Sequence, residues 1–117
     1  MTYDFSGKVA IVTGGTRGLG RKIAQRLADS GCKVAVCGRN APDDLPQAIT
    51  FHQADIRDPD QARALVDAVV AAHGRIDILV NNAGGSPASG VATASPRFID
   101  AILKLNLVGP LYMAQAA

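Results

Sequence analysis

Tryptophan is absent from this chain of 117 residues, and aromatic residues make up only 4% of it. Single-stranded nucleic acid is usually bound by stacking its bases on aromatic side chains, and a net charge of +2 is too small to indicate a phosphate backbone as a partner. No apolar run approaches the roughly 20 residues that span a bilayer, and the first residues include Asp4 and Lys8 rather than an apolar signal core. We therefore expect a cytoplasmic protein that binds neither nucleic acid nor a membrane.

Cysteine is also scarce, since Cys32 and Cys37 are the only two. They lie five residues apart in one expected strand, which separates them by about 16 Å at roughly 3.3 Å per residue. A disulfide needs Cα atoms within about 7 Å, so both thiols are predicted to be reduced and packed. The sequence nearby supplies no His or Asp partners for a thiol nucleophile or a metal, and we predict no metal site.

What the chain does contain is an alternation of short apolar runs with helical patterns. Nearly continuous apolar runs occur at 9–12, 34–37, 48–51 and 76–80, and such runs are typical of strands buried on both faces. With helices between them, these strands predict an α/β protein with a parallel, doubly wound sheet of the Rossmann type. Four strands are fewer than the six or more that such a fold usually has, so the predicted sheet is incomplete.

Three helices are predicted between and after these strands. The first stops at Gly31, and the second begins at the N-cap Asp58, with Gln61 completing a capping box. The connection 38–47 is too rich in proline for a regular crossover helix. The third helix begins near Ser95 and is expected to carry on one face the apolar residues Phe98, Ile102, Leu105 and Met113.

The octapeptide at residues 13–20, Thr-Gly-Gly-Thr-Arg-Gly-Leu-Gly, directly follows the first apolar run. Glycine has no Cβ, so Gly14, Gly18 and Gly20 permit a tight strand-to-helix turn whose amides face a ligand. The first turn of a helix carries unsatisfied N–H groups and the positive end of the helix dipole, which together attract a pyrophosphate. The octapeptide therefore predicts a phosphate-binding turn, with an ordinary glycine-rich turn as the alternative.

The spacing T-G-x-x-x-G-x-G, together with Asn-Asn-Ala-Gly at 81–84, resembles the short-chain dehydrogenase/reductase family. The resemblance extends from about Asp4 to Ala117. It implies an oxidoreductase that uses NAD(P)(H) to interconvert a carbonyl and an alcohol of a small molecule by hydride transfer. The two motifs imply the following cofactor-binding residues: Gly14, Thr16, Arg17, Gly18, Leu19, Gly20, Asn82, Ala83 and Gly84.

Two arginines predict which form of the cofactor is preferred. An acidic residue about 20 positions beyond the glycine turn usually binds the ribose 2′-hydroxyl of NAD, but Gly38 and Arg39 occupy that place. Arg39 offers a permanently charged fork for a 2′-phosphate, and Arg17 can reach the same group from the other side. NADP(H) is therefore predicted over NAD(H); the alternative is that both arginines are simply solvated.

Asp55 and Ile56 follow the third apolar run, at the edge of the sheet where open α/β folds bind ligands. In the resembled family an Asp and an aliphatic residue at this place bracket the adenine ring, and the Asp accepts a hydrogen bond from the adenine amino group. The alternative is that Asp55 only caps a turn before Asp58.

Reduction of a carbonyl creates a developing alkoxide that needs a proton and hydrogen-bond donors. In the resembled family a Tyr supplies the proton, a Lys four residues later lowers the pKa of that Tyr, a Ser orients the carbonyl, and an Asn supports a water relay to the Lys. Asn106 matches that Asn, although a polar residue at a helix irregularity is the alternative. Tyr3 is followed four positions later by Gly7 and Tyr112 by Ala116, so no Tyr-x-x-x-Lys exists and these 117 residues alone are predicted to be inactive.

Residues 1–117 are therefore expected to be the N-terminal part of a single dinucleotide-binding domain whose catalytic part is absent. The loop at 85–90 is expected to border the substrate cleft. The resemblance implies a homo-oligomer, either a dimer or a tetramer. Two other functions stay open: a non-catalytic dinucleotide sensor, or a truncated remnant that associates through a helix face carrying Ile102 and Leu105.

Overall fold

The computed structural model describes residues 3–84 and 92–117. Along the chain its elements are β1 (Val9–Thr13), α1 (Gly18–Asp29), β2 (Lys33–Gly38), β3 (Ile49–Gln53), α2 (Pro59–His73), β4 (Ile78–Val80), α3 (Pro96–Leu103), the π-helical segment η1 (Lys104–Val108) and α4 (Gly109–Ala116). The strands form one sheet in the order β3-β2-β1-β4. The predicted α/β fold of the Rossmann type is confirmed.

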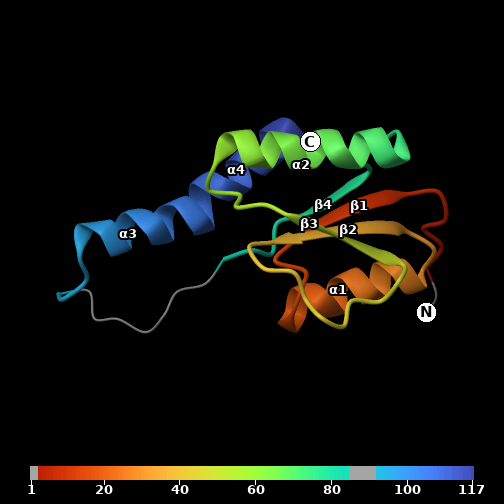
Figure 1. The fold of residues 1–117 in the computed structure, drawn as a ribbon, viewed down its shortest axis with the longest axis horizontal. Coiled ribbons are helices and arrows are strands. Elements are labelled where there is room, and N and C mark those ends of the chain that lie inside the picture. Colours follow the sequence, from red (N-terminus) through yellow and green to blue (C-terminus); the bar gives the residue numbers. More distant parts are fainter. Residues whose placement is uncertain (1–2, 85–91) are drawn as a thin grey trace.

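Every strand pair in this sheet is parallel. Val9–Thr13 lies opposite Lys33–Cys37, Val34–Gly38 lies opposite Ile49–Gln53, and β4 pairs with the middle of β1. Helix α1 covers one face of the sheet, and helices α2 and α4 cover the other (Figure 1). Because the strands run in the same direction, their carboxyl ends meet at one edge, where the loops to the helices begin.

The sheet is buried on both faces because side chains of its central strands alternate between two apolar layers. In β1, Val9 and Ile11 pack against α2, whereas Ala10 and Val12 pack on the side of α1. All four are buried, as the continuous apolar run predicted. Burying each of the larger side chains contributes about 1.5–3 kcal/mol, so these layers hold the strand ends, and the site at that edge, in place.

The connection between β2 and β3 contains no helix, as its prolines predicted. Leu45 from this connection packs against the apolar layer on the α1 side. Nη1 of Arg21 on α1 donates to Oδ1 of Asp44 at 2.8 Å, and Nη2 donates to the Asp44 carbonyl at 2.6 Å. These contacts attach the connection to α1 in the absence of a crossover helix.

All four observed strands differ from the predicted ranges, and two of them differ by two residues at one end. β4 is limited to Ile78–Val80, because the chain at Asp77 makes a different contact: the Asp77 carboxylate accepts from Val9 N. β3 continues to Gln53, because the pairing between the two strands extends to Gly38 of β2, which lies opposite Gln53. Pattern alone misses such shifts because they depend on the neighbouring strand.

The predicted capping box of α2 is also corrected. Asp58 is the N-cap and its carboxylate accepts from Asp60 N, as a capping residue does. However, the Gln61 side chain does not bond to the Asp58 N–H; its Oε1 accepts from Asp55 N, and its Nε2 donates to the Asp58 carboxylate. The Asp58 N–H instead donates to the Asp55 carbonyl, which removes it as a partner for Gln61. Gln61 thus connects the helix to the end of β3.

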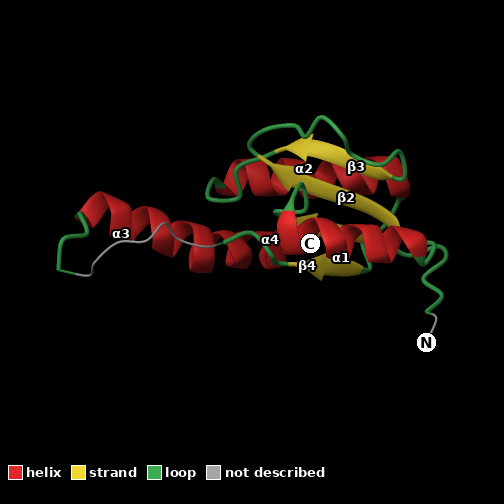
Figure 2. Cartoon of the chain, turned by 90° about the horizontal axis from the view of Figure 1, so that it is seen from below, coloured by secondary structure: helices red, strands yellow, loops and turns green. Residues whose placement is uncertain are grey.

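The third predicted helix is not continuous. Gly109 N donates to the Lys104 carbonyl, five residues earlier, which is the wider spacing of a π-helix. Pro110 has no N–H with which to continue the α-helical pattern, and Asn106 Nδ2 donates to the Ile102 carbonyl. The helix irregularity that the sequence left open is therefore present at Asn106. Met113 is fully buried against α2, whereas α3 extends away from the sheet (Figure 2).

The alternative function as a truncated remnant needs an exposed helix face with Ile102 and Leu105, and the structure does not provide it. Ile102 and Leu105 are half-buried, and Leu105 packs against the apolar layer on the α2 side. The exposed large apolar side chains of this region are instead Ile99, Leu103, Leu107 and Leu111. The apolar face predicted from the helical period, with Phe98, Ile102, Leu105 and Met113, is therefore the more buried one.

The two cysteines are free and buried, as predicted, and they lie in opposite apolar layers. Cys32 directly precedes β2 rather than lying within it. Within the described residues, no group of His, Cys, Asp or Glu side chains has the arrangement of a metal site, and no helix has the length and apolar character that a membrane crossing needs.

Candidate functional site

An open cleft of about 680 Å³ lies at the carboxyl ends of the strands. Its volume is within the range of natural ligand sites. It brings together most of the site residues predicted from the sequence: Gly14, Thr16, Arg17, Gly18, Arg39, Asp55, Ile56, Asn82, Ala83 and Gly84. Gly38, Asn40, Pro42, Arg57 and Leu105 also line it.

The glycine turn between β1 and α1 forms one wall of this cleft. Gly14 and Gly18 have φ values of 64° and 60°, a region that other residues rarely adopt. Gly20 has an ordinary φ, but a Cβ there would collide with the Asn82 side-chain amide and the Gly14 carbonyl. Helix α1 can begin so close to β4 only because residue 20 has no side chain.

The first turn of α1 has no acidic residue, and its N-cap, Arg17, makes no side-chain capping bond. The N–H groups of a helix start need partners, which a bound anion can supply. Leu19 and Gly20, also predicted to bind the cofactor, lie in this turn but are not among the residues that line the cleft. Leu19 is exposed, and Gly20 is buried.

Thr13, the last residue of β1, joins the glycine turn to the end of β4. Its hydroxyl is fully buried, accepts from Asn82 N at 3.1 Å and from Ala83 N at 3.0 Å, and donates to the Val80 carbonyl. Asn82 Nδ2 donates to the Gly14 carbonyl at 3.2 Å. The asparagine motif therefore holds the sheet and the turn together, while Ala83 and Gly84 face the cleft.

Asn106 reaches this part of the molecule from η1. A Cβ at Gly84 would lie 2.7 Å from Asn106 Oδ1, so glycine at 84 permits the two segments to approach. Asn81 Nδ2 donates to the Pro110 carbonyl at 3.5 Å and supports the same junction. The structure thus places Asn106 beside Gly84 at the rim of the cleft. The predicted loop at 85–90 lies outside the described residues.

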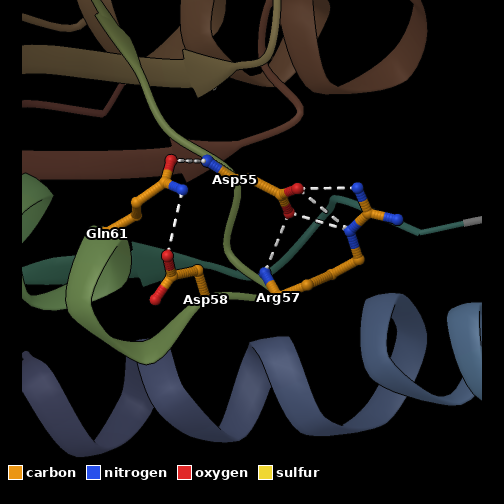
Figure 3. A network of polar contacts seen from close by, with 4 residues as sticks. All are labelled: Asp55, Arg57, Asp58 and Gln61. Atoms are coloured by element: carbon orange, nitrogen blue, oxygen red, sulfur yellow. Dashed lines mark hydrogen bonds and ion pairs between the residues drawn. The ribbon is translucent and has the colours of Figure 1, made fainter.

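Asp55, after β3, is paired with a residue that the sequence analysis did not identify. Arg57 N and Nε donate to Asp55 Oδ1 at 3.0 and 2.9 Å, and Arg57 Nη2 donates to Oδ2 at 2.6 Å (Figure 3). Hydrogen bonding from Arg57 holds the pKa of the Asp55 carboxyl below its ordinary value. Asp55 thus forms the turn that was its alternative role, and it also lines the cleft.

Arg17 and Arg39 line the same cleft and are exposed. Within the described residues neither takes part in an ion pair, unlike Arg21, Arg57 and Arg75. With Asp55 balanced by Arg57, these two guanidinium groups leave the cleft positively charged. Such a cleft attracts anionic ligands.

Thr13 and Arg57 are the functional residues that sequence reasoning missed. Asp55 itself is a residue type that favours a side-chain turn, but the N–H that such a turn uses is present in every residue except proline, so the sequence did not single out Arg57. The buried hydroxyl of Thr13 had no comparable signal, since its partners lie about 70 positions away.

The parallel sheet and the glycine turn that opens α1 define an α/β protein of the Rossmann type. A family model described as short chain dehydrogenase matches residues 8–117. The chain belongs to the short-chain dehydrogenase/reductase family.

Curated relatives and solved structures agree with this family. (+)-Borneol dehydrogenase 1 of Salvia officinalis is 38% identical over 119 residues, which cover 95% of this chain and 46% of that protein. 2-Dehydro-3-deoxy-D-gluconate 5-dehydrogenase of Escherichia coli is 36% identical over 122 residues, covering 98% and 48%. A short chain dehydrogenase of Burkholderia cenocepacia, solved in complex with NADP, has a TM-score of 0.89 and 38% identity over 96% of this chain and 50% of that chain. The chain spans about half the length of these relatives.

Proposed function

We propose that this chain is the cofactor-binding part of an NADP(H)-dependent oxidoreductase that interconverts a carbonyl and an alcohol. One observation carries the proposal: the glycine turn, Asp55 with Ile56, and Asn82 to Gly84 all line one cleft at the carboxyl edge of the sheet. That edge is where open α/β sheets bind ligands. The relatives named as dehydrogenases support the same reaction class.

The cleft has the features that a dinucleotide needs. A Cβ at Gly14 would come within 3.0 Å of the Ala83 Cα, so glycine keeps the floor of the cleft open between β1 and β4. The adjacent start of α1 presents N–H groups without a side-chain cap, which suits a pyrophosphate. Asp55 and Ile56 are assigned to the adenine ring, and Ala83 and Gly84 to the nicotinamide ribose.

Arg17 and Arg39 are assigned to the ribose 2′-phosphate, which makes NADP(H) the preferred form. Both line the cleft, and a planar guanidinium donates two parallel hydrogen bonds to a phosphate. The only carboxylate among the described cleft residues, Asp55, is paired with Arg57 and so repels a phosphate less.

When bound, the dinucleotide supplies the hydride. The chain's own residues bind and orient: Thr13 and Asn82 fix the two cleft walls, and Asn106 brings an amide beside Gly84, where it is assigned to a water relay. The chain has no Tyr-x-x-x-Lys for proton transfer. We therefore expect these 117 residues alone to bind the cofactor weakly and to be inactive.

Titration of the full-length protein with NADPH and with NADH tests the preference. We expect NADPH to bind at least about tenfold more tightly, since hydrogen bonds to charged groups contribute roughly 1.5–3 kcal/mol. Arg39→Asp should remove or reverse this difference. Arg63→Asp is the matched control, because Arg63 is an exposed arginine of α2 that does not line the cleft. Equal affinity of the unmodified protein for both cofactors would refute the preference.

A further inference from the structure

The pair formed by Asp55 and Arg57 has more contacts than a single ion pair. Three N–H groups of Arg57 donate to one carboxylate: the backbone N, Nε and Nη2. Nε also lies 3.1 Å from Oδ2 and is shared between the two oxygens. Both side chains are partly exposed, at 27% for Asp55 and 32% for Arg57, and both line the cleft.

The backbone of Asp55 is fixed separately. Asp55 N donates to Gln61 Oε1 at 2.9 Å, and the Asp55 carbonyl accepts from Asp58 N at 3.1 Å. Gln61 and Asp58 belong to the start of α2, where the Asp58 carboxylate caps the helix (Figure 3). The first turn of α2 therefore holds the main chain of Asp55, which leaves the orientation of its carboxylate to Arg57.

The hydrogen-bonding capacity of the carboxylate decides what else it can bind. An ionised carboxylate has about four acceptor positions and no donor. Arg57 occupies three of them with its three N–H groups, so about one remains for a ligand in the cleft. One N–H of the exocyclic amino group of adenine can donate to this remaining position, whereas a keto oxygen in its place has no hydrogen to donate.

We propose that Arg57 is a positioning residue that orients the Asp55 carboxylate so that its remaining acceptor distinguishes adenine from a base with a 6-keto group. The inference rests on the proposed function, because it concerns the adenine end of the same cleft. Arg57 acts through Asp55 and need not touch the cofactor. Its removal should therefore reduce selectivity for the amino group more than it reduces binding of dinucleotides in general.

The test compares NADP+ with nicotinamide hypoxanthine dinucleotide phosphate, which carries a keto oxygen in place of the adenine amino group. Dissociation constants for both are measured by calorimetry on the full-length protein and on Arg57→Ala, Arg57→Lys and Arg75→Ala. Arg75 is the matched control, since its side chain also pairs with an Asp two positions away, Asp77, but at the opposite edge of the sheet. Thermal unfolding of each variant reports whether it is folded.

We expect the unmodified protein and Arg75→Ala to bind NADP+ about tenfold or more tightly than the hypoxanthine form, as one hydrogen bond to a charged group implies. In Arg57→Ala the ratio should fall to about threefold or less, and Arg57→Lys, which keeps the charge but loses the fork, should lie between. Adding Asp55→Ala to Arg57→Ala should lower the ratio no further than Asp55→Ala alone.

An unchanged ratio in folded Arg57→Ala or Arg57→Lys would overturn the inference. So would equal binding of the two dinucleotides by the unmodified protein, which would leave the proposed function intact because the dinucleotide still binds. Failure of the unmodified protein to bind either dinucleotide would overturn the proposed function itself, and the inference with it.

Discussion

Replacement of Thr13 by Val should destabilise the protein, because it removes a buried hydroxyl without changing the shape of the side chain. Thr13 is fully buried and accepts hydrogen bonds from Asn82 N and Ala83 N. Asn82 N keeps a second acceptor, the Val80 carbonyl at 3.1 Å, so Ala83 N is the group left without its partner. A donor that loses its partner costs about 1–3 kcal/mol where it is buried, and Ala83 N is part-buried; the weakened bond at Asn82 adds a smaller amount.

We therefore expect Thr13→Val to lower the free energy of unfolding by about 1–3 kcal/mol, measured by urea denaturation of the full-length protein. Thr13→Ser is the control: it keeps the hydroxyl and loses one methyl group, which costs about 1 kcal/mol. Dinucleotide affinity should also fall in Thr13→Val, since Ala83 lines the cleft. If Thr13→Val were as stable as Thr13→Ser, the hydroxyl would not be what holds β4 to the glycine turn.

Two further changes test the glycine turn and the electrostatics of the sheet. Gly20→Ala should abolish measurable dinucleotide binding, because the added Cβ would collide with the Asn82 amide. In Gly18→Ala the added Cβ meets no atom within 4 Å, so this variant should lose only about 1 kcal/mol of stability through backbone strain. Equal dinucleotide binding by the two variants would contradict this prediction. Hydrogen bonds from Arg75 and from Val9 N lower the pKa of Asp77 below 3.8, so this carboxylate stabilises the fold above that pH. The contribution of Asp77 to stability should disappear as the pH falls from about 4 through the lowered pKa. In Asp77→Asn the urea-denaturation midpoint should therefore fall less with pH in that range than in the unmodified protein. An equally steep fall of the midpoint in the variant would count against this assignment.

Local chemistry explains why much of the fold could be predicted from the sequence. A continuous apolar run such as Val9 to Val12 can be buried only between two layers, and Gly31 and Gly74 both adopt the positive φ expected of glycines that end helices. The cleft was predictable for a similar reason. Parallel strands bring their carboxyl ends together, so motifs far apart in the sequence had to meet at one edge.

The parts that could not be predicted depend on contacts between distant segments. The π-helical segment interrupts the predicted third helix around Asn106, and a regular helical period contains no sign of that interruption. Gln61 was expected to complete a capping box but instead bonds to Asp55, because Asp58 N had already found the Asp55 carbonyl. In both cases a local rule was overridden by a partner that the rule does not include.

A crystal structure of the full-length protein with bound NADP+ would test the central claim most directly. We predict the pyrophosphate at the N–H groups that begin α1, the 2′-phosphate within hydrogen-bond distance of Arg17 and Arg39, and the adenine amino group at the Asp55 carboxylate. A dinucleotide bound away from the glycine turn, or a 2′-phosphate that contacts neither arginine, would contradict the account.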